Sequence, residues 1–359
     1  MNPSVIRSFA AAQAVLFRIS GNETAAAACK KVRRVVIVNP LRGEVGMPAH
    51  YHTRLILRRL PLFCTQHDTM PLRPSLGRLA AMWKYLSISI VGLALFAAPL
   101  PDPVNPDPNT PRPIEAVDSV FIEDLTWMEV RDALKDGKDT VIVATGGVEQ
   151  NGPYLVAGKH NIILRATTEA IARKLGKTLV APIVPFVPEG NIDPPDSHMK
   201  YHSTISVTEE TYAALLTDIC GSLRAHGFKR IILIGDSGGN QTGLKNVAAE
   251  LNAKWKDGCR LYYIPEYYDF SGVSKWLEEQ GIKQTPEGLH DDFAMTAMMM
   301  SVDPTSVRTK QRIAAGKFSI NGVNLAPAEK TIEWGKKIVD FRAEQTVKVI
   351  RKAMSEQPK

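Results

Sequence analysis

The feature that most constrains the fold is an alternation of short apolar runs with segments of helical periodicity. Strands are expected where Val, Ile, Leu and Tyr dominate, at 140–146, 178–186, 230–235 and within 260–268. Helices are expected between these runs, at 162–175, 208–226 and 239–256. Continuous apolar runs are typical of strands buried on both faces, and strands separated by helices favour a parallel sheet. The pattern therefore predicts an α/β fold of three layers (α/β/α), with a mostly parallel central sheet.

The alternation lies within residues 115–355, which we interpret as one domain. Thr126 and Glu129 have the spacing of a capping box, which predicts a helix that begins there and ends at Gly137. The proline-rich residues 99–114 predict an extended linker ahead of the domain. Further helices are expected in the C-terminal part, at 272–280, 291–300 and 327–354.

The positive net charge of the chain is confined to its N-terminal part. Residues 1–81 carry 12 Lys and Arg against three Asp and Glu, a net charge of +9, whereas the whole chain has +7. The remainder is therefore nearly neutral and gives no electrostatic reason to expect a nucleic-acid partner. We interpret residues 1–81 as a basic leader that is not part of the mature protein.

Residues 82–98 resemble a secretory signal peptide. Lys84 precedes an apolar run at 86–96, which is shorter than the ~18–20 residues that a membrane-spanning helix needs. A signal peptide begins a protein, so Met82 is the expected start. The segment predicts an exported protein, periplasmic or secreted. An uncleaved membrane anchor and a transit-type leader remain as alternatives.

Three polar, glycine-bearing segments follow predicted strands or open a predicted helix. They are TGGVEQNGPYLVAGKHN at 145–161, GDSGGNQ at 235–241 and GLHDDFAMT at 288–296. In open α/β sheets, ligands bind outside the carboxyl ends of the strands, and glycines let the backbone approach a ligand closely. Carboxylate, imidazole, hydroxyl and amide groups gathered there suggest a hydrolytic or metal site.

At these segments the chain resembles the creatininase (creatinine amidohydrolase-like) family. The family motif G-S-x-E-Q-H-G-P-H-L-P-L-x-x-D corresponds to GGVEQNGPYLVAGKH at 146–160, and N-G-H-G-G-N corresponds to GDSGGN at 235–240. The family's H-A-G-x-x-E-T-S corresponds to residues 290–297, and its G-T-I-S segment and HGF-(K/R)-(R/K)-I stretch to 203–206 and 226–231. Because these segments follow one another in the same order, the resemblance covers almost the whole predicted domain.

Several metal-ligand positions of the family carry other residues here. The family's first glutamate corresponds to Glu149, but its next histidine corresponds to Asn151 and its bridging aspartate to His160. The histidine of the middle motif becomes Ser237, and the glutamate of the third motif becomes Met295. The resemblance therefore implies an altered metal site, in which one divalent ion is expected rather than two.

Zn or Mn is the expected ion, since imidazole and carboxylate ligands suit both metals. Glu149, His160 and Asp236 are the expected ligands. His290 could also be one of the residues that surround the ion, and Asp291 or Asp292 could take the place of Asp236. Each residue also has a structural alternative. Glu149 could accept backbone amide hydrogens, His160 could cap a helix, and Asp236 with Ser237 could form a helix N-cap.

The resemblance also implies catalytic roles. His290 matches a catalytic-type histidine and would move a proton to the leaving nitrogen, together with Asp236 and Ser237. The developing oxyanion and the substrate would be contacted by five further residues: Gly238, Gly239, Asn240, Asn151 and His198.

The function implied is that of a metal-dependent amidohydrolase, which hydrolyses a non-peptide C–N bond in a small cyclic or linear amide. The alternative is an exported, catalytically silent protein that binds a small molecule on the same scaffold, and the replacements at Asn151, Ser237 and Met295 favour it. The resemblance further implies a homo-oligomer, a hexamer. The identity of the substrate does not follow from the sequence.

Overall fold

The computed structural model describes residues 104–356. The predictions for the basic leader and for the signal segment lie outside the described residues. Within the described part of the linker, residues 104–114 form neither helix nor strand. Among the described residues, no helix is long and apolar enough to cross a membrane.

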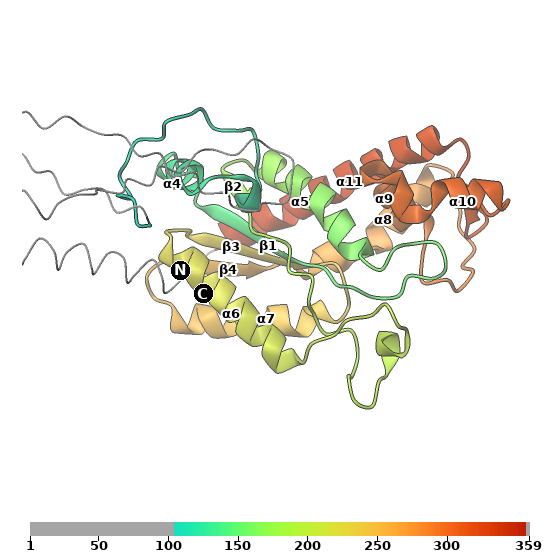
Figure 1. Ribbon diagram of the computed structural model, residues 1–359, viewed down its shortest axis with the longest axis horizontal. Helices are drawn as coiled ribbons and strands as arrows, with labels where there is room; N and C mark the ends of the chain where they lie inside the picture. Colours follow the sequence, from blue (N-terminus) through green and yellow to red (C-terminus); the bar gives the residue numbers. More distant parts are fainter. Residues whose placement is uncertain (1–103, 357–359) are drawn as a thin grey trace, which may run out of the picture. The chain divides into compact units, whose positions relative to one another are not determined.

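Four parallel strands form the central sheet in the order β2–β1–β3–β4 (Figure 1). The strands are β1 (Thr140–Thr145), β2 (Thr178–Val180), β3 (Arg230–Gly235) and β4 (Arg260–Tyr263). β1 and β3 pair along their full length, from Thr140 beside Arg230 to Thr145 beside Gly235. The prediction of a parallel sheet is confirmed.

The second strand is shorter than the predicted range of 178–186. Its ladder ends at Val180, and beyond it the chain meets β1 only in the isolated bridge between Thr145 and Val184. Pro182 and Pro185 interrupt the run, and a proline cannot donate a ladder hydrogen bond. The composition of this segment is that of a strand, but its prolines prevent continuous pairing.

The helices follow the predicted pattern closely. The longer ones are α4 (Trp127–Lys135), α5 (Lys159–Leu175), α6 (Glu209–Ala225), α7 (Asn240–Lys254), α8 (Ser271–Glu279), α9 (Phe293–Val302) and α11 (Ala328–Ser355). The capping box of α4 is present, since Thr126 Oγ1 accepts from the Glu129 amide and Glu129 Oε2 accepts from the Thr126 amide.

The sequence pattern did not predict the shortest elements. They are α10 (Thr309–Ala314), the hairpin of β5 (Ser319–Ile320) and β6 (Val323–Asn324), and the 3-10 segments η1 (Ile122–Asp124), η2 (Ser197–Lys200), η3 (Pro265–Tyr268) and η4 (Pro304–Val307). Each is too short to show a hydrophobic period, so no pattern in the sequence marks it.

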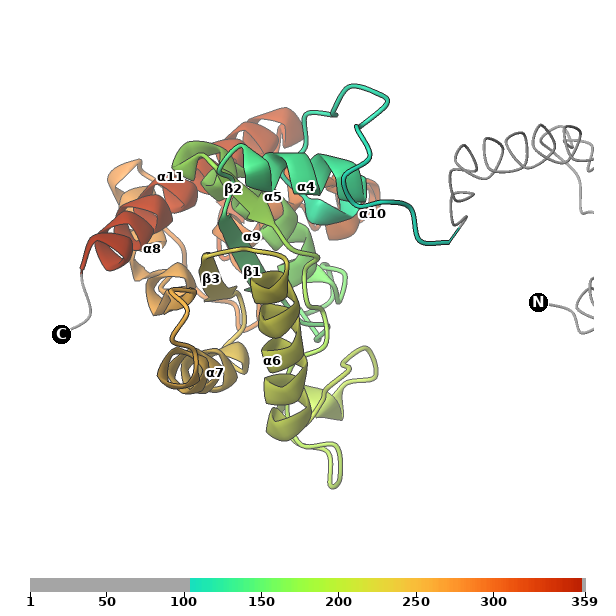
Figure 2. The ribbon, with the colours of Figure 1, turned by 90° about the vertical axis from the view of Figure 1, so that its left-hand side faces the viewer.

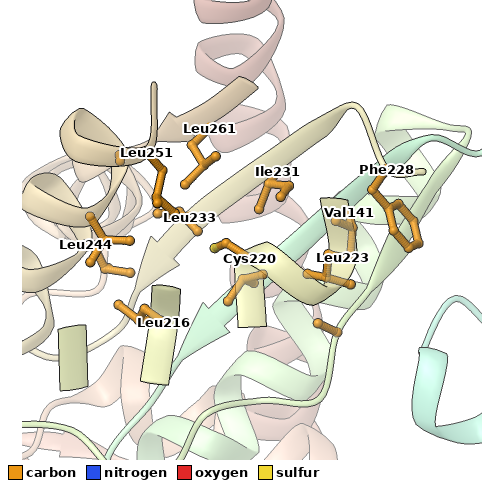
Figure 3. Packing of buried hydrophobic residues seen from close by; sticks show 14 of the residues in the cluster. Val141, Leu216, Cys220, Leu223, Phe228, Ile231, Leu233, Leu244, Leu251 and Leu261 are labelled. Atoms are coloured by element: carbon orange, nitrogen blue, oxygen red, sulfur yellow. The ribbon is translucent and has the colours of Figure 1, made fainter. Parts of the chain in front are cut away.

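Successive side chains of the strands pack on opposite faces of the sheet. Val141 and Val143 of β1 belong to the core beneath α6 and α7, where Cys220 of α6 is fully buried (Figure 3). Ile142 and Ala144 belong to the core beneath α5 and α11. Figures 1 and 2 show these two helix pairs on the two sides of the sheet. The three-layer α/β/α architecture is therefore confirmed, and the apolar runs are continuous because both faces are covered.

A third hydrophobic cluster lies around α9, beyond the end of the sheet (Figure 1). Met298, Met299 and Met300 are fully buried in it, and it also contains Ile163 of α5 and Ile338 of α11. This cluster packs α9 against the two helices that cover one face of the sheet. It therefore positions the segment that precedes α9.

The four strands are parallel, but the direction in which the chain adds strands to the sheet reverses once. After β1 the chain crosses to β2 on one side, and β3 then lies on the other side of β1. In doubly wound sheets such a switch point leaves a crevice at the carboxyl ends of the two central strands. The loops that follow β1 and β3 both begin at this crevice.

Candidate functional site

A pocket of about 580 Å³ lies at the carboxyl ends of β1 and β3, where the three predicted polar segments meet. It is also lined by parts of the loop after β2 and of the segment after β4. The lining residues are Glu149, Lys159, His160, Pro188, Glu189, Gly190, Ser197, His198, Asp236, Ser237, Gly238, Gly239, Tyr268, Phe270, His290, Asp291, Asp292 and Met295.

His160 joins the loop after β1 to the loop after β3. Its Nε2 donates to Glu149 Oε1 at 2.7 Å, and its Nδ1 donates to Asp236 Oδ2 at 2.8 Å. All three side chains are buried. Because ionised carboxylates only accept hydrogen bonds, both ring nitrogens carry a hydrogen and His160 is an imidazolium. Burial opposes this charge, but the bonds to Asp236 and Glu149 outweigh burial and raise the pKa of His160.

The C-terminal helix α11 holds the Asp236 oxygen that does not bond to His160. Arg342 of α11, which is 4% exposed, donates through a guanidinium nitrogen to Asp236 Oδ1 at 3.0 Å and to the backbone oxygen of Tyr267 at 3.0 Å. Burial alone would raise the pKa of Asp236, but the charge of Arg342 and the bond from His160 hold it below its usual value. Asp236 is therefore a buried carboxylate whose oxygens both have cationic partners.

Glu149 is the carboxylate around which Lys159 and the histidines of the pocket gather. Lys159 Nζ lies 3.4 Å from its Oε1, and His198 Nε2 lies 3.3 Å from its Oε2. Burial favours the neutral acid, but the bond and charge of His160 and the charge of Lys159 lower the pKa of Glu149 to about 2. Glu149 is thus ionised at neutral pH. Lys159, one of its partners, was not predicted from the sequence to belong to the site.

His198 and His290 stack at the mouth of this group, with ring centroids 4.6 Å apart. His290 Nδ1 donates to the backbone oxygen of Gln150 at 2.9 Å, which leaves Nε2 facing Glu149 Oε1 at 3.8 Å. His290 itself has φ of 53°, and Ser197 beside His198 has φ of 44°. Both are left-handed conformations that cost energy for a residue other than glycine, and such strain is found preferentially at functional sites.

These two histidines change the expected ligand set. Glu149, His198 and His290 each offer one ligand atom, and the three atoms lie within 4.8 Å of one another. His160 and Asp236, the other predicted ligands, instead use their facing atoms for each other and for Glu149 and Arg342. The structure thus places the predicted substrate residue His198 and the predicted proton carrier His290 beside Glu149. One carboxylate and two imidazoles suit Zn or Mn, so the residues present fit one divalent ion.

Glu189 is a second buried carboxyl group that the sequence reasoning missed. Its Oε2 accepts from Ser237 Oγ at 3.1 Å, and its Oε1 has no hydrogen-bond partner among the described residues. A Cβ atom on Gly147 would lie 2.2 Å from that Oε1, so the glycine makes room for it. Burial and the charge of Glu149 raise the pKa of Glu189 to about 8. Glu189 is a lone acid in a proline-rich loop, and no motif marks it.

Asn151 and Asn240 are placed differently from the prediction that both contact substrate. Neither lines the pocket, and both are buried. The Asn151 amide donates to the backbone oxygen of Glu149 at 2.9 Å. Asn240 Oδ1 accepts from the Ser237 amide at 2.8 Å, and its Nδ2 donates to the backbone oxygen of Gly146 at 3.2 Å. These side chains hold the loops that carry Glu149 and Ser237.

Gly238 and Gly239 do line the pocket, in agreement with their predicted position. A Cβ atom on Gly239 would lie 1.8 Å from the backbone oxygen of Pro188, so this close approach requires glycine. The two alternative aspartates also line the pocket, but each accepts a hydrogen bond from α9. Asp292 is the N-cap of α9, and Asp291 Oδ2 accepts from Thr296 Oγ1 at 2.7 Å.

Comparison with known proteins agrees with the motifs. Residues 123–350 match the profile of the creatininase family, described as creatinine amidohydrolase. The chain is 24% identical over 193 residues to the 3-dehydro-scyllo-inosose hydrolase of Thermotoga maritima, covering 53% of this chain and 58% of that protein. It is 25% identical over 118 residues to the creatinine amidohydrolase of Pseudomonas putida, covering 32% of this chain and 44% of that protein. The chain thus spans about half the length of these two relatives.

The fold also resembles a solved structure. A tryptophan-to-alanine mutant of a creatininase superposes with a TM-score of 0.51 at 19% identity, and the match covers 66% of this chain and 100% of that one. At this identity the likeness concerns the fold alone.

Proposed function

The chain belongs to the creatininase family, and from that membership we propose that it hydrolyses a non-peptide C–N bond in a small cyclic or linear amide. We further propose that the reaction depends on one divalent ion, Zn or Mn. The observation that carries the proposal is the meeting of Glu149, His198 and His290 in a polar pocket at the switch point of the sheet.

A divalent ion bound to this group would polarise a carbonyl group and make a water molecule more acidic. The residues of the chain would fix the geometry. His160 and Asp236 hold the Glu149 carboxylate in one orientation, and the Arg342 guanidinium holds Asp236. Residues that orient a ligand in this way typically change metal affinity ~10–100-fold when they are replaced.

The substrate would lie between this group and the turn after β3. Ser237, Gly238 and Gly239 line the pocket, and the backbone N–H groups of the two glycines are the proposed contacts of the substrate oxygen, since the Ser237 hydroxyl already donates to Glu189. The Nδ1 atom of His290 is bonded to the backbone oxygen of Gln150, so its Nε2 is the atom that can take part in the reaction. This atom either holds the ion or carries a proton to the leaving nitrogen. Replacement of His290 separates the two roles, since only the first would lower the metal content.

One observation favours the alternative, a catalytically silent binding protein. The negative charge of Glu149 is already compensated by Lys159 and by the imidazolium of His160. A carboxylate with such partners is stable in a buried site without an ion.

Metal binding by the purified protein tests the proposal. The wild type is expected to bind one Zn²⁺ or Mn²⁺ per chain, measured by elemental analysis after dialysis. Glu149→Gln keeps the shape of the side chain but removes its charge, and His198→Ala removes an imidazole. We expect each to lower the affinity at least ~10-fold. His202→Ala removes an exposed histidine of the same loop and should leave binding unchanged.

Equal metal content in the wild type and in Glu149→Gln, or none in either, would leave the binding protein as the better description. Activity is then measured on two probes that the names of the relatives supply, creatinine and 3-dehydro-scyllo-inosose. Creatinine has the C–N bond that the proposal requires, whereas the inosose is a carbocyclic ketone without nitrogen, so opening of its ring would break a C–C bond. Opening of the creatinine ring supports the proposal, opening of the inosose ring alone contradicts it, and a metal-loaded wild type that opens neither ring would place the substrate among other small amides. Turnover that persists after complete metal removal would contradict the proposed metal dependence.

We also propose that the protein is exported and that it assembles as a homo-oligomer, a hexamer. The family resemblance supports the assembly, and the signal-like segment supports export. Light scattering at micromolar concentration is expected to give about six times the mass of one chain, and a monomer at every concentration would remove the proposal.

A further inference from the structure

We propose that Lys159 is a built-in cation of the pocket, whose ammonium group shares Glu149 with the divalent ion and takes the place of a second one. This inference rests on the proposed function, because it concerns how many ions the same site can hold. It assigns a role to a residue that no motif of the sequence marks.

The position of Lys159 carries the argument. It is the first residue of α5 and is 3% exposed, although its side chain is long and charged. Lysine is almost never buried to this extent without a partner, because the ammonium group loses its hydration. Its partner is Glu149 Oε1, at 3.4 Å. The ammonium group therefore lies inside the pocket because a carboxylate of the candidate metal site holds it there.

Lys159 and the ion compete for the same carboxylate. Glu149 Oε1 already accepts from His160 Nε2 at 2.7 Å, and His290 Nε2, a candidate ligand atom, lies 3.8 Å from it. An ion held by Glu149, His198 and His290 would therefore lie within a few ångströms of the Lys159 ammonium group. Like charges at such distances repel strongly in a buried site. A second ion could not bind next to the first without displacing Lys159.

Lys159 shares the pocket with polar residues of two other segments. His290, Asp291 and Asp292, before α9, line it together with Lys159 and Glu149. The ammonium group thus lies in the same pocket as residues of the loop after β1 and of the segment before α9. With three N–H donors, it can also bind a substrate oxygen beside the ion.

Replacement of Lys159 by a neutral side chain of similar length tests this role. Zn²⁺ alone, and Mn²⁺ alone, are titrated calorimetrically into the metal-free full chain. The wild type is expected to bind one ion, and Lys159→Met to bind at least tenfold more tightly or to accept a second ion. Lys159→Arg keeps the charge and should behave as the wild type. Lys200→Met removes a charge from an exposed lysine at the end of η2 and should change the affinity by less than threefold.

The outcomes separate this inference from the proposed function. Unchanged or weaker binding in Lys159→Met, with metal still lost in Glu149→Gln, would overturn the inference and leave the metal site intact. Binding in Lys159→Met but not in the wild type would support the inference and contradict the metal dependence of the natural chain. Binding in neither would overturn both. If Lys159→Met does not fold, as judged by circular dichroism, Lys159→Gln replaces it, because its amide can still bond to Glu149.

Discussion

Charged side chains form a continuous buried line from the C-terminal helix to the pocket. Arg342, Asp236, His160, Glu149 and Lys159 follow one another with alternating sign, and each contacts the next. A buried charge is costly unless it is paired, so the removal of one member leaves its neighbours uncompensated. Replacement of any one of these residues is therefore expected to affect both the stability of the protein and the function of the pocket.

Arg342 is the member of this line that lies farthest from the pocket, and its replacement tests how much the line contributes to the stability of the protein. Arg342→Met removes the guanidinium from Asp236, which is fully buried, while it preserves much of the side-chain volume. We expect the free energy of unfolding to fall by about 3–5 kcal/mol, the usual cost of removing one partner of a buried ion pair. Urea denaturation followed by circular dichroism measures it.

Arg351→Met on the same helix is the matched control. Arg351 is exposed, and among residues 104–356 it bonds only to the backbone oxygen of Lys174 at 2.9 Å, so its loss should cost less than ~0.5 kcal/mol. Equal losses in the two variants would show that Asp236 does not depend on Arg342.

At the scale of elements, the site depends on how closely α9 packs on α11. Gly335 of α11 is buried against α9, and a Cβ atom there would lie 2.0 Å from the backbone oxygen of Ala297. The absence of a side chain lets the two helices approach, and their contact positions the segment that carries His290. The long helix thus supports the pocket in two ways, by this packing and by Arg342.

Gly335→Ala is expected to lower the free energy of unfolding by about 1–3 kcal/mol, the usual cost of overpacking. Gly221→Ala in α6 makes the same chemical change where, apart from the backbone of its own helix, no atom of the described residues lies within 4 Å of the new Cβ. That variant should instead be about 0.5–1 kcal/mol more stable, because alanine has the better helix propensity. Urea midpoints that shift in the same direction for both would contradict the close packing of α9 on α11.

At the scale of the whole molecule, three hydrophobic clusters account for the described core. One lies on each face of the sheet and one lies around α9. A chain that starts at residue 99 keeps every residue of these clusters. We expect it to unfold at the same urea concentration as the full chain, within the error of the measurement. A truncated chain that is insoluble or unfolds earlier would show that residues 1–98 belong to the fold.

Much of this architecture could be predicted from local patterns. The apolar runs at β1 and β3 and the helical periods of α5, α6 and α7 appear in the structure close to their predicted bounds. The site was predictable in position, since the polar segments follow β1 and β3, but only partly in composition. His198 lies in a loop without periodicity. Lys159 occupies a variable position of the motif, next to His160 at the family's ligand position, so the motif did not indicate a role for it. Glu189 had no motif around it.

The amino-acid sequence is enough to predict the layers, because the burial of a strand or a helix follows from the spacing of its apolar residues. It also determined the family, because the motifs follow one another in order along the domain. Which groups share Glu149 becomes apparent only in the folded chain. His160 and Asp236, expected as ligands, bond to each other, whereas His198 and His290 arrive from separate loops. The physical reason is that contacts between distant loops depend on backbone geometry and charge pairing in the folded state, which no local spacing encodes.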